Sequence, residues 1–533
     1  MGNSARLEEI LGEKIGFVLS NANAISIPFA LFSGGPEVRI REENLAVIID
    51  ERASDIAILG VIRRIRRLEP FLRQYQRVSI IDFPHMYEDV EKLPYTNAEI
   101  IPLAELKIEN GEIKSLSNTV TYIPFPGSKV HLLKKGKILS VLLESFLEGE
   151  KPLVIGEHKY TPGLEIPLNP KFLRYHVGVF GATGMGKSRL IKALVDEIVQ
   201  KTDYSVIIFD HTGMDFAPFY PRSTIYSTEI KLDPITAANW LVSKTRVSEN
   251  VAQYIEGAFL KLFSELEDGE SNDAIIREMI DIMNDYSKAE DEVSREELAD
   301  LFYQKLLNLI PRIAKQMGAK YADVQLKTRM ELFVKPFEVA NVLLRSLSPD
   351  DVIDYAREFK RTMNAPLVID LSLEDTIEAK RAIIASIIRA VWNRVIEAVQ
   401  KSKNGGGGNL EQKIIFVIDE AQNYAYRARY CEEQVEKIAR EGRKWAIGLI
   451  IASQRLANSV STDIRANINT IFFSRLNQTT DLDEISKFAD ISGVTLQSLA
   501  QLDQREFFVA GLMNPFRKPI VIRVKEVKAP GEY

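Results

Sequence analysis

A glycine-rich stretch between two apolar runs carries the residues of this sequence that are best suited to chemistry. Residues 177–199 read VGVFGATGMGKSRLIKALVDEIV, and Gly181, Gly186, Lys187 and Ser188 satisfy the pattern G-x-x-x-x-G-K-[ST]. Glycines at this spacing let successive backbone N–H groups turn toward phosphate oxygens, and the helix that follows adds a partial positive charge. In this pattern the lysine reaches the β- and γ-phosphates, and the serine hydroxyl binds Mg²⁺.

The alternative is a flexible turn between a strand and a helix. We favour a site for ATP and Mg²⁺, because the stretch lies between an apolar strand and an amphipathic helix, as the motif requires. The predicted nucleotide-binding residues are Gly181, Ala182, Thr183, Gly184, Met185, Gly186, Lys187, Ser188 and Arg189.

A second apolar run, KIIFVIDEAQ, ends in Asp419 and Glu420. Ligands of parallel sheets bind beyond the carboxyl ends of the strands. We therefore predict that Asp419 holds Mg²⁺ through water and that Glu420 orients and deprotonates the attacking water. Taken alone, two acids after a strand are weak support, because every strand ends in polar residues; together with the glycine loop they indicate hydrolysis.

Two further stretches leave alternatives open. The run LIIASQRL ends in Ser453 and Gln454, and Gln454 either contacts the γ-phosphate or is an ordinary polar strand end. The run KIAREGRKWA is helical up to Gly442, which suits a helix C-cap. Arg440, Arg443 and Lys444 near it either complement the helix dipole or supply an arginine finger to a neighbouring subunit.

The elements that must position these residues alternate between apolar strands and helices from about residue 166. This pattern predicts an α/β fold with a parallel sheet that is covered on both faces. The strands are YHVGVFGA, YSVIIFDHTG, APLVIDLSL, KIIFVIDEAQ, AIGLIIASQR and NTIFFSRL, followed by REFFVAGL and PIVIRVKEV. Residues 246–365 contain almost no strand pattern and predict an inserted helical bundle, with helix starts at Ser294, paired with Glu297, and at Ser348.

The N-terminal region, to about residue 125, reads as several short strands, which favour a small β-barrel or sandwich. Asn110 and Gly111 stand between alternating apolar positions and predict a hairpin turn. Six arginines crowd this region, and we favour a solvated face over contact with DNA or a partner. They are Arg63, Arg64, Arg66, Arg67, Arg73 and Arg77.

Length and composition exclude several classes of protein. A chain of 533 residues is too long for one core, and its net charge of −6 gives no general support for a nucleic-acid partner. The single cysteine, Cys431, excludes a disulfide within the chain and a cysteine-rich zinc site. We find no signal peptide and no apolar run that spans a membrane, and therefore expect a cytoplasmic protein without a membrane partner.

Several of these stretches together resemble the HerA branch of the FtsK–HerA ATPases. They are VFGATGMGKS, IIFDHTGMD, IDEAQNY, IAREGRKWAIGLIIASQR and NTIFFSRL, in family order. The resemblance implies a RecA-like P-loop NTPase core with an inserted helical bundle and an N-terminal HAS-like barrel. The expected boundaries are 1–125 for the barrel, 126–165 for a connecting segment, 166–245 and 366–533 for the core, and 246–365 for the bundle.

The same resemblance implies a function. HerA-like proteins are homo-hexameric ring ATPases that translocate double-stranded DNA, and several process DNA ends with the nuclease NurA. It implies Lys187 as the phosphate-binding lysine, Asp419 as the magnesium carboxylate and Glu420 as the catalytic glutamate. It also implies Gln454 as the γ-phosphate sensor and Arg443 as the finger. Two rival functions are a coupling or secretion-type ring ATPase and a nucleotide-gated scaffold with low turnover.

The sequence departs from the family at three places. An Arg-His pair often precedes the first core strand of the family, whereas here Tyr175 separates Arg174 from His176. Where the family has a stretch like HGEY, this sequence reads HTGMDF, with Asp215 near the position of the acid. Where the family has SQRP, this sequence reads SQRL. For DNA contacts in a pore, the candidates are the turns after Asp210 and after Gln454, which include Arg455 and Arg465.

Overall fold

The protein divides into two compact units that interleave along the chain. The computed structural model describes residues 5–31, 40–68, 95–247, 249–268, 271–289, 291–318, 322–403 and 410–527. The first unit comprises the residues up to Asp203, Ala452–Ala457 and the residues from Arg465 onward, and the second comprises Tyr204–Ile451 and Asn458–Ile464. Within the described residues, none of the helices combines the length and the apolar character that crossing a bilayer requires.

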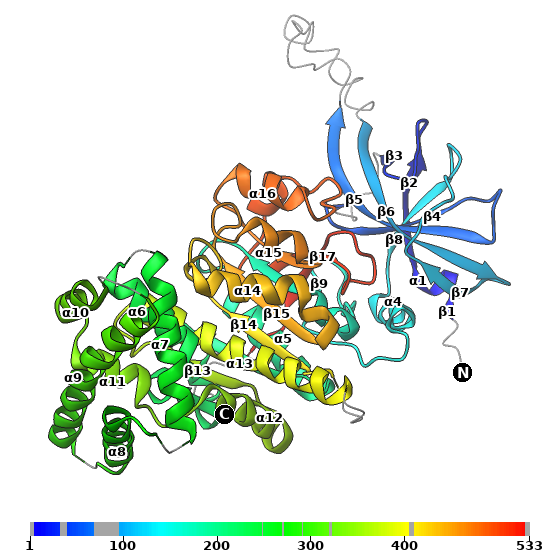
Figure 1. The fold of residues 1–533 in the computed structure, drawn as a ribbon. Coiled ribbons are helices and arrows are strands. Elements are labelled where there is room, and N and C mark those ends of the chain that lie inside the picture. The colour runs from blue at the N-terminus through cyan, green and yellow to red at the C-terminus, as the bar shows by residue number, and fades with distance from the viewer. Residues whose placement is uncertain are drawn as a thin grey trace, which may run out of the picture. The chain divides into compact units, whose positions relative to one another are not determined.

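The N-terminal part of the first unit is an antiparallel sheet of eight strands (Figure 1). Its order is β1-β7-β6-β3-β2-β8-β4-β5, and β5 also pairs with β6, so six of the strands close into a ring. Its core contains Phe29, Ile48, Ile58, Ile100 and Val130. The elements are β1 (Ala5–Arg6), α1 (Leu7–Ile10), β2 (Leu11–Val18), β3 (Ile27–Leu31), β4 (Leu45–Ile49), β5 (Ile56–Leu68), β6 (Tyr95–Glu109), β7 (Glu112–Ser117), β8 (Lys129–Leu133) and α4 (Gly136–Leu143).

The predicted hairpin at Asn110 and Gly111 is confirmed. Glu109 at the end of β6 pairs with Glu112 at the start of β7. Asn110 and Gly111 both have positive φ, at 52° and 77°, as a tight two-residue turn of this kind requires.

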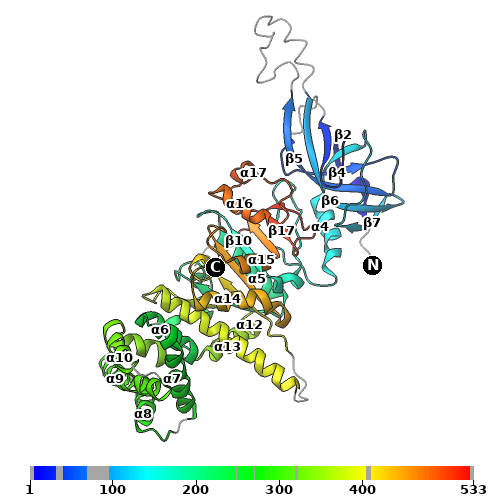
Figure 2. The ribbon, with the colours of Figure 1, turned by 45° about the horizontal axis from the view of Figure 1, so that its top comes forward.

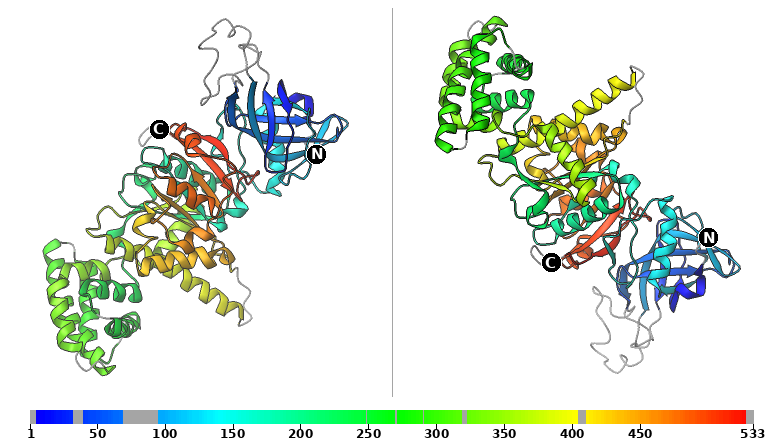
Figure 3. Two further views of the ribbon diagram at one scale, coloured as in Figure 1. Left: turned by 90° about the horizontal axis from the view of Figure 1, so that it is seen from above. Right: turned by 90° about the horizontal axis from the view of Figure 1, so that it is seen from below.

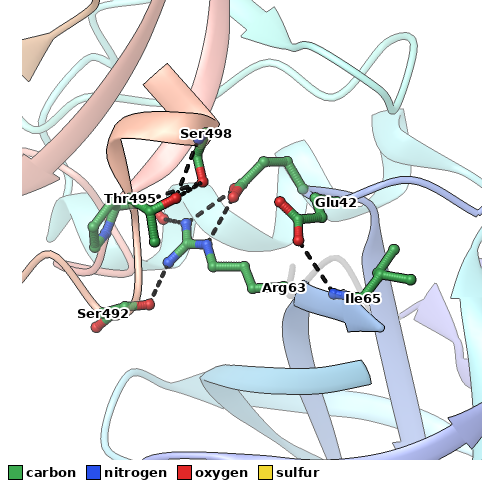
Figure 4. A network of polar contacts seen from close by, with 8 residues as sticks. Glu42, Arg63, Ile65, Ser492, Thr495 and Ser498 are labelled. Atoms are coloured by element: carbon green, nitrogen blue, oxygen red, sulfur yellow. Dashed lines mark hydrogen bonds and ion pairs between the residues drawn. The ribbon is translucent and has the colours of Figure 1, made fainter. Parts of the chain in front are cut away.

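The prediction of a solvated arginine face is wrong for Arg63. Its side chain is 1% exposed and donates to both carboxylate oxygens of Glu43, at 2.7 and 3.0 Å. It also donates to the carbonyls of Ser492 and Pro519, at 2.7 and 2.8 Å (Figure 4). Arg64 is exposed, as predicted, and pairs with Glu99. Arg66 is exposed, whereas the Arg67 side chain, Arg73 and Arg77 lie outside the described residues.

The rest of the first unit contributes five strands in the order β10-β16-β17-β18-β9. β10 and β16 are parallel, and the other neighbours are antiparallel. The helix after β10 buries Leu190, Leu194 and Ile198, which are the residues of its predicted apolar face. The elements are β9 (Gly156–His158), β10 (Val177–Phe180), α5 (Lys187–Lys201), β16 (Thr470–Phe473), α16 (Thr479–Ser486), α17 (Leu496–Ala500), β17 (Glu506–Gly511) and β18 (Ile520–Val524).

The second unit is built on five parallel strands in the order β12-β13-β11-β14-β15. Four of them follow predicted runs, so the expected α/β architecture is confirmed for this unit. They are β11 (Ser205–Asp210), β13 (Leu367–Asp370), β14 (Ile414–Ile418) and β15 (Ile447–Ser453), whose last two residues belong to the first unit, with β12 (Thr224–Tyr226) added at the edge. Every residue of these four predicted strands is buried.

Helices make up most of the remainder of this unit, and α7 to α11 form a group that is separate from the strands in every view (Figures 1–3). α12 instead packs against β11, β13 and α13. The helices are α6 (Pro234–Thr245), α7 (Glu249–Asp268), α8 (Ala274–Lys288), α9 (Glu292–Gln316), α10 (Ala322–Phe333), α11 (Pro336–Leu343), α12 (Pro349–Met363), α13 (Ile377–Lys403) and α14 (Tyr430–Glu441), with α15 (Thr462–Asn467) at the unit boundary.

Of the two predicted helix starts, one is confirmed. Ser348 caps α12 in a capping box with Asp351. The predicted start at Ser294 is wrong, because Asp291 caps α9 by accepting the Ser294 N–H at 2.7 Å. An aspartate is as good a cap as a serine, so the sequence offered two nearby starts. The composition of the run KNGGGGN, residues 403–409, predicts a flexible surface loop, and residues 404–409 of this run lie outside the described residues.

Candidate nucleotide-binding site

The glycine loop joins the buried strand β10 to α5 in the first unit. Gly184 and Gly186 have φ angles of 82° and 91°, which favour glycine over any residue with a side chain. A Cβ on Gly181 would lie 3.2 Å from the Cβ of Ser474, so this position is also tight. Lys187, the first residue of α5, donates its Nζ hydrogen to the Gly181 carbonyl over 3.0 Å, across the loop. These features suit a backbone that curls around phosphate.

Three other segments hold this loop in place. The Gly181 N–H donates to the Ser453 carbonyl at 3.4 Å, and the Ala182 N–H donates to the Arg475 carbonyl at 2.8 Å. On the other side, the Arg505 N–H donates to the Met185 carbonyl at 2.9 Å. Arg475 and Arg505 lie in the quoted runs NTIFFSRL and REFFVAGL, but neither was predicted as a site residue, because each forms its hydrogen bond to the loop through its backbone.

Gln454 lies against the loop. The Thr183 hydroxyl donates to Gln454 Oε1 over 3.0 Å, and both residues belong to the first unit. Ser453, which precedes Gln454 at the end of β15, is 1% exposed. The structure therefore brings the predicted sensor to the predicted phosphate loop.

Asp419 and Glu420 follow β14 in the second unit. Asp419 is 5% exposed and accepts the Glu420 N–H at 2.8 Å. Glu420 is partly exposed and has left-handed dihedral angles, with φ 48° and ψ 47°. Its carboxylate accepts a hydrogen bond from the Gln422 side chain. A left-handed glutamate is uncommon, and such backbone conformations concentrate at functional sites.

A group of residues that the sequence did not single out supports the turn after Glu420. Tyr424, at the end of this turn, forms a 2.6 Å hydrogen bond between its hydroxyl and His211 Nδ1. Arg381 on α13 donates Nε to the Asn423 carbonyl at 2.7 Å, and Lys380 donates to the His211 carbonyl at 2.9 Å. Burial and the positive charge of Lys380 lower the pKa of His211, and burial raises the pKa of Tyr424, so both are uncharged at neutral pH.

The loop after β11 is held by a buried carboxylate. Asp210 is fully buried and accepts the N–H groups of Gly213, Phe216 and Ala217 at 2.8–3.0 Å. Asp215, the acid of HTGMDF, accepts the Thr212 hydroxyl at 3.0 Å. Asp210 therefore fixes the shape of this loop, and Asp215 contacts a residue of the same loop.

Arg443 lies in the short helical turn Gly442–Trp445 after α14, and both Arg443 and Lys444 are exposed. Gly442 is the C-cap of α14, as predicted, but its φ of −55° suits any residue. The reason for glycine is space, since a Cβ there would lie 2.7 Å from the Ile447 carbonyl oxygen. Arg440 pairs with Asp463 at 3.5 Å on the surface.

The other predicted cations differ in their surroundings. Arg174 lies in the turn Pro170–Tyr175, before β10. Arg455 is exposed. Arg465, named as a candidate for DNA contact, pairs with Glu484 at 2.6 Å and is 16% exposed. This ion pair argues against Arg465 as a phosphate contact.

The donor set of the predicted site suits ATP and Mg²⁺. Mg²⁺ prefers oxygen ligands and is usually held by one or two carboxylates together with substrate phosphates. The predicted ligands, the Ser188 hydroxyl and the Asp419 carboxylate, are both oxygen donors of this kind. In the part of the chain that the structure describes, no group of three or more His, Cys, Asp or Glu side chains could hold a metal without phosphates.

Known proteins resemble this chain over the same region. Residues 153–391 match the family model of the central domain of helicase HerA. The DNA double-strand break repair helicase HerA of Sulfolobus acidocaldarius is 24% identical over 68% of this chain and 66% of its own length. That of Pyrococcus furiosus is 20% identical over 97% of this chain and 93% of its own length.

The chain is thus similar to helicase HerA over its central part. Among solved structures, the chain is similar to VirB4 of Thermoanaerobacter pseudethanolicus, with a TM-score of 0.44 and 14% identity over 72% of this chain and 98% of that one. The chain covers 66% of the length of the Sulfolobus relative.

Proposed function

We propose that this chain is an ATP-driven translocase or helicase that acts on double-stranded DNA as a hexameric ring. DNA end processing or repair with a NurA-like nuclease partner is the proposed setting. The observation that supports the proposal most is the hydrogen bond from Thr183 to Gln454, because it sets a polar side chain beside the phosphate loop. The relatives named as DNA double-strand break repair helicases support the choice of DNA.

Each predicted residue has a role in this proposal. Lys187 and the loop N–H groups bind the phosphates, and Ser188 and Asp419 hold Mg²⁺, which neutralises charge on the phosphates when bound. Glu420 orients the attacking water and accepts its proton. Gln454 contacts the γ-phosphate, and Arg443 offsets transition-state charge at the site of the adjacent subunit. Loss of the γ-phosphate would then release the contact between subunits.

The parts of the chain have proposed roles as well. The closed N-terminal sheet corresponds to the HAS-like barrel that the resemblance implies for residues 1–125, and it extends past that boundary to β8. Residues 246–365 correspond to the inserted helical bundle, apart from α12, which packs against β11, β13 and α13, and residues 166–245 with 366–533 correspond to the RecA-like core.

ATP turnover with and without duplex DNA tests the proposal. Lys187→Ala should abolish turnover, because the lysine binds the phosphates that react. Turnover by the unsubstituted protein should rise with DNA length, and mass measurement with nucleotide should give a hexamer. Turnover that ignores duplex DNA in an assembled particle would contradict the translocase and favour a coupling ATPase or a scaffold.

A mixing experiment tests the finger. Glu420→Gln and Arg443→Ala subunits are each expected to be inactive alone. Mixed rings would contain some sites with both an intact Glu420 and an intact Arg443, so partial turnover should return. If no ratio of the two restores turnover, Arg443 does not act across subunits.

A further inference from the structure

The second unit contains a large cavity between α6, α7, α13 and the segment that leads into α14. Its volume is about 1400 Å³, and its lining includes residues from 235–256 and 378–434. Sites for small molecules usually enclose about 300–1,000 Å³. The cavity is therefore larger than most sites for a small molecule and has room for part of a polymer.

The lining of this cavity, which we name the basic cavity, is positively charged. Six basic side chains face three carboxylates, in a chain whose net charge is −6. The basic residues are Lys244, Arg246, Arg381, Arg389, Arg427 and Arg429, and the carboxylates are Glu256, Glu378 and Glu433. The lining therefore carries more positive than negative charge, which favours an anionic occupant over an apolar one.

Three of the six basic side chains can contact an anion that enters the cavity. Lys244 pairs with Glu338 at 2.9 Å, and Arg389 pairs with Asp233 at 3.4 Å. Arg246, Arg427 and Arg429 are exposed, and none of them pairs with a carboxylate among the described residues. Among the described residues, no carboxylate neutralises these three charges.

The same three arginines share an uncommon backbone. Arg246 and Arg427 have φ of 51°, and Arg429 has φ 46° with ψ −126°. Positive φ is rare for residues other than glycine and asparagine, and the strain costs about 1–3 kcal/mol at each position. Glycine would remove this strain, so the backbone conformation by itself does not favour arginine at these positions.

We propose that the basic cavity binds the phosphodiester backbone of duplex DNA. Guanidinium groups bind phosphate through two parallel N–H bonds, and such contacts hold DNA without reading its bases. The inference rests on the proposed function and locates its DNA contact. The contact lies after Glu420, rather than after Asp210 or Gln454, where the sequence suggested it.

The basic cavity is connected to the predicted catalytic residue within the same unit. Arg381 lines the cavity and donates to the carbonyl of Asn423, which ends the short helical turn that follows Glu420. A phosphate that draws the Arg381 guanidinium toward it would weaken this bond and alter the turn. Binding of DNA in the cavity would thereby change the position of Glu420 and the rate of ATP hydrolysis.

The salt dependence of DNA binding tests the inference. Fluorescent duplex DNA is titrated with the full-length protein and a non-hydrolysable ATP analogue at several salt concentrations. The R427G/R429G variant removes two charges and relieves backbone strain, so it should fold at least as well as the parent. The slope of log K against log salt should become shallower by about 2, since each phosphate contact contributes about 0.9.

Two control variants complete the test. R427K/R429K keeps both charges and should retain most of the slope. R277A/R361A removes two exposed arginines of α8 and α12, outside the cavity, and should leave the slope unchanged.

The possible outcomes separate the two proposals. If the unsubstituted protein binds duplex DNA and R427G/R429G has the same slope, the basic cavity does not bind DNA, and the proposed function stands. If the unsubstituted protein does not bind duplex DNA although it hydrolyses ATP, both duplex DNA as substrate and this inference are wrong.

Discussion

The hydroxyl of Thr183 donates to Gln454 Oε1 over 3.0 Å, which joins the phosphate loop to the residue that follows β15. These residues are 271 positions apart in the sequence. This bond holds the Gln454 side chain beside the phosphate loop, where the γ-phosphate is the contact that we propose for its N–H₂ group.

Gln454→Ala is therefore expected to lower kcat by about 100-fold, a typical loss for one donor to a developing charge. ATP binding should change little, as measured by titration with a fluorescent ATP analogue. Thr183→Val keeps Gln454 but removes its orienting partner, and should lower kcat by a smaller factor. A Gln454→Ala variant with normal kcat would exclude Gln454 from the reaction.

Gly442→Ala tests how Arg443 is positioned. The added methyl would lie 2.7 Å from the Ile447 carbonyl, so the turn that carries Arg443 must shift. We expect ATP turnover to fall about tenfold or more, as a misplaced catalytic group implies, while ATP binding persists. Arg440→Ala, on the same helix, removes only an exposed ion pair and is the matched control. Equal turnover by the Gly442→Ala variant and the parent would contradict this account.

The buried pair of Arg63 and Glu43 predicts a large effect on stability. Arg63→Met leaves the Glu43 carboxylate buried without its partner, which should lower the free energy of unfolding by about 3–5 kcal/mol. Denaturant titration of the single variant measures this loss. The double variant Arg63→Met with Glu43→Leu should recover most of it, because no uncompensated charge remains. A loss of similar size in both variants would mean that packing, rather than charge, accounts for the effect.

His158 predicts a pH dependence of stability. Burial lowers its pKa to about 3, so it stays neutral in the folded protein. Below its ordinary pKa of 6.5 the unfolded chain binds a proton that the folded protein does not, and stability falls by about 1.4 kcal/mol per pH unit down to about pH 3. His158→Asn, whose amide can still bond to Thr161, should show a weaker fall in unfolding temperature between pH 6.5 and 4.5. The same fall in both proteins would assign it to other groups.

The local sequence was sufficient to predict most of the regular elements. The apolar runs that became β11, β13, β14 and β15 are buried along their whole length, and such runs have few other stable environments. The hairpin at Asn110 and the cap at Ser348 were predictable for a similar reason, since each depends on a few adjacent residues. The start of α9 was missed because Asp291 and Ser294 both suit a cap.

The sequence by itself determined the types of residue available for chemistry: a glycine loop with Lys187 and Ser188, and two acids after a buried strand. Only the tertiary structure decided that Gln454 lies against Thr183, that Arg63 is buried with Glu43, and that arginines from the end of α6, from α13 and from the segment before α14 line one cavity. Strand and turn patterns depend on neighbours in the chain. Contacts between distant segments depend instead on how the strands are ordered in the sheets, and no local pattern records that order.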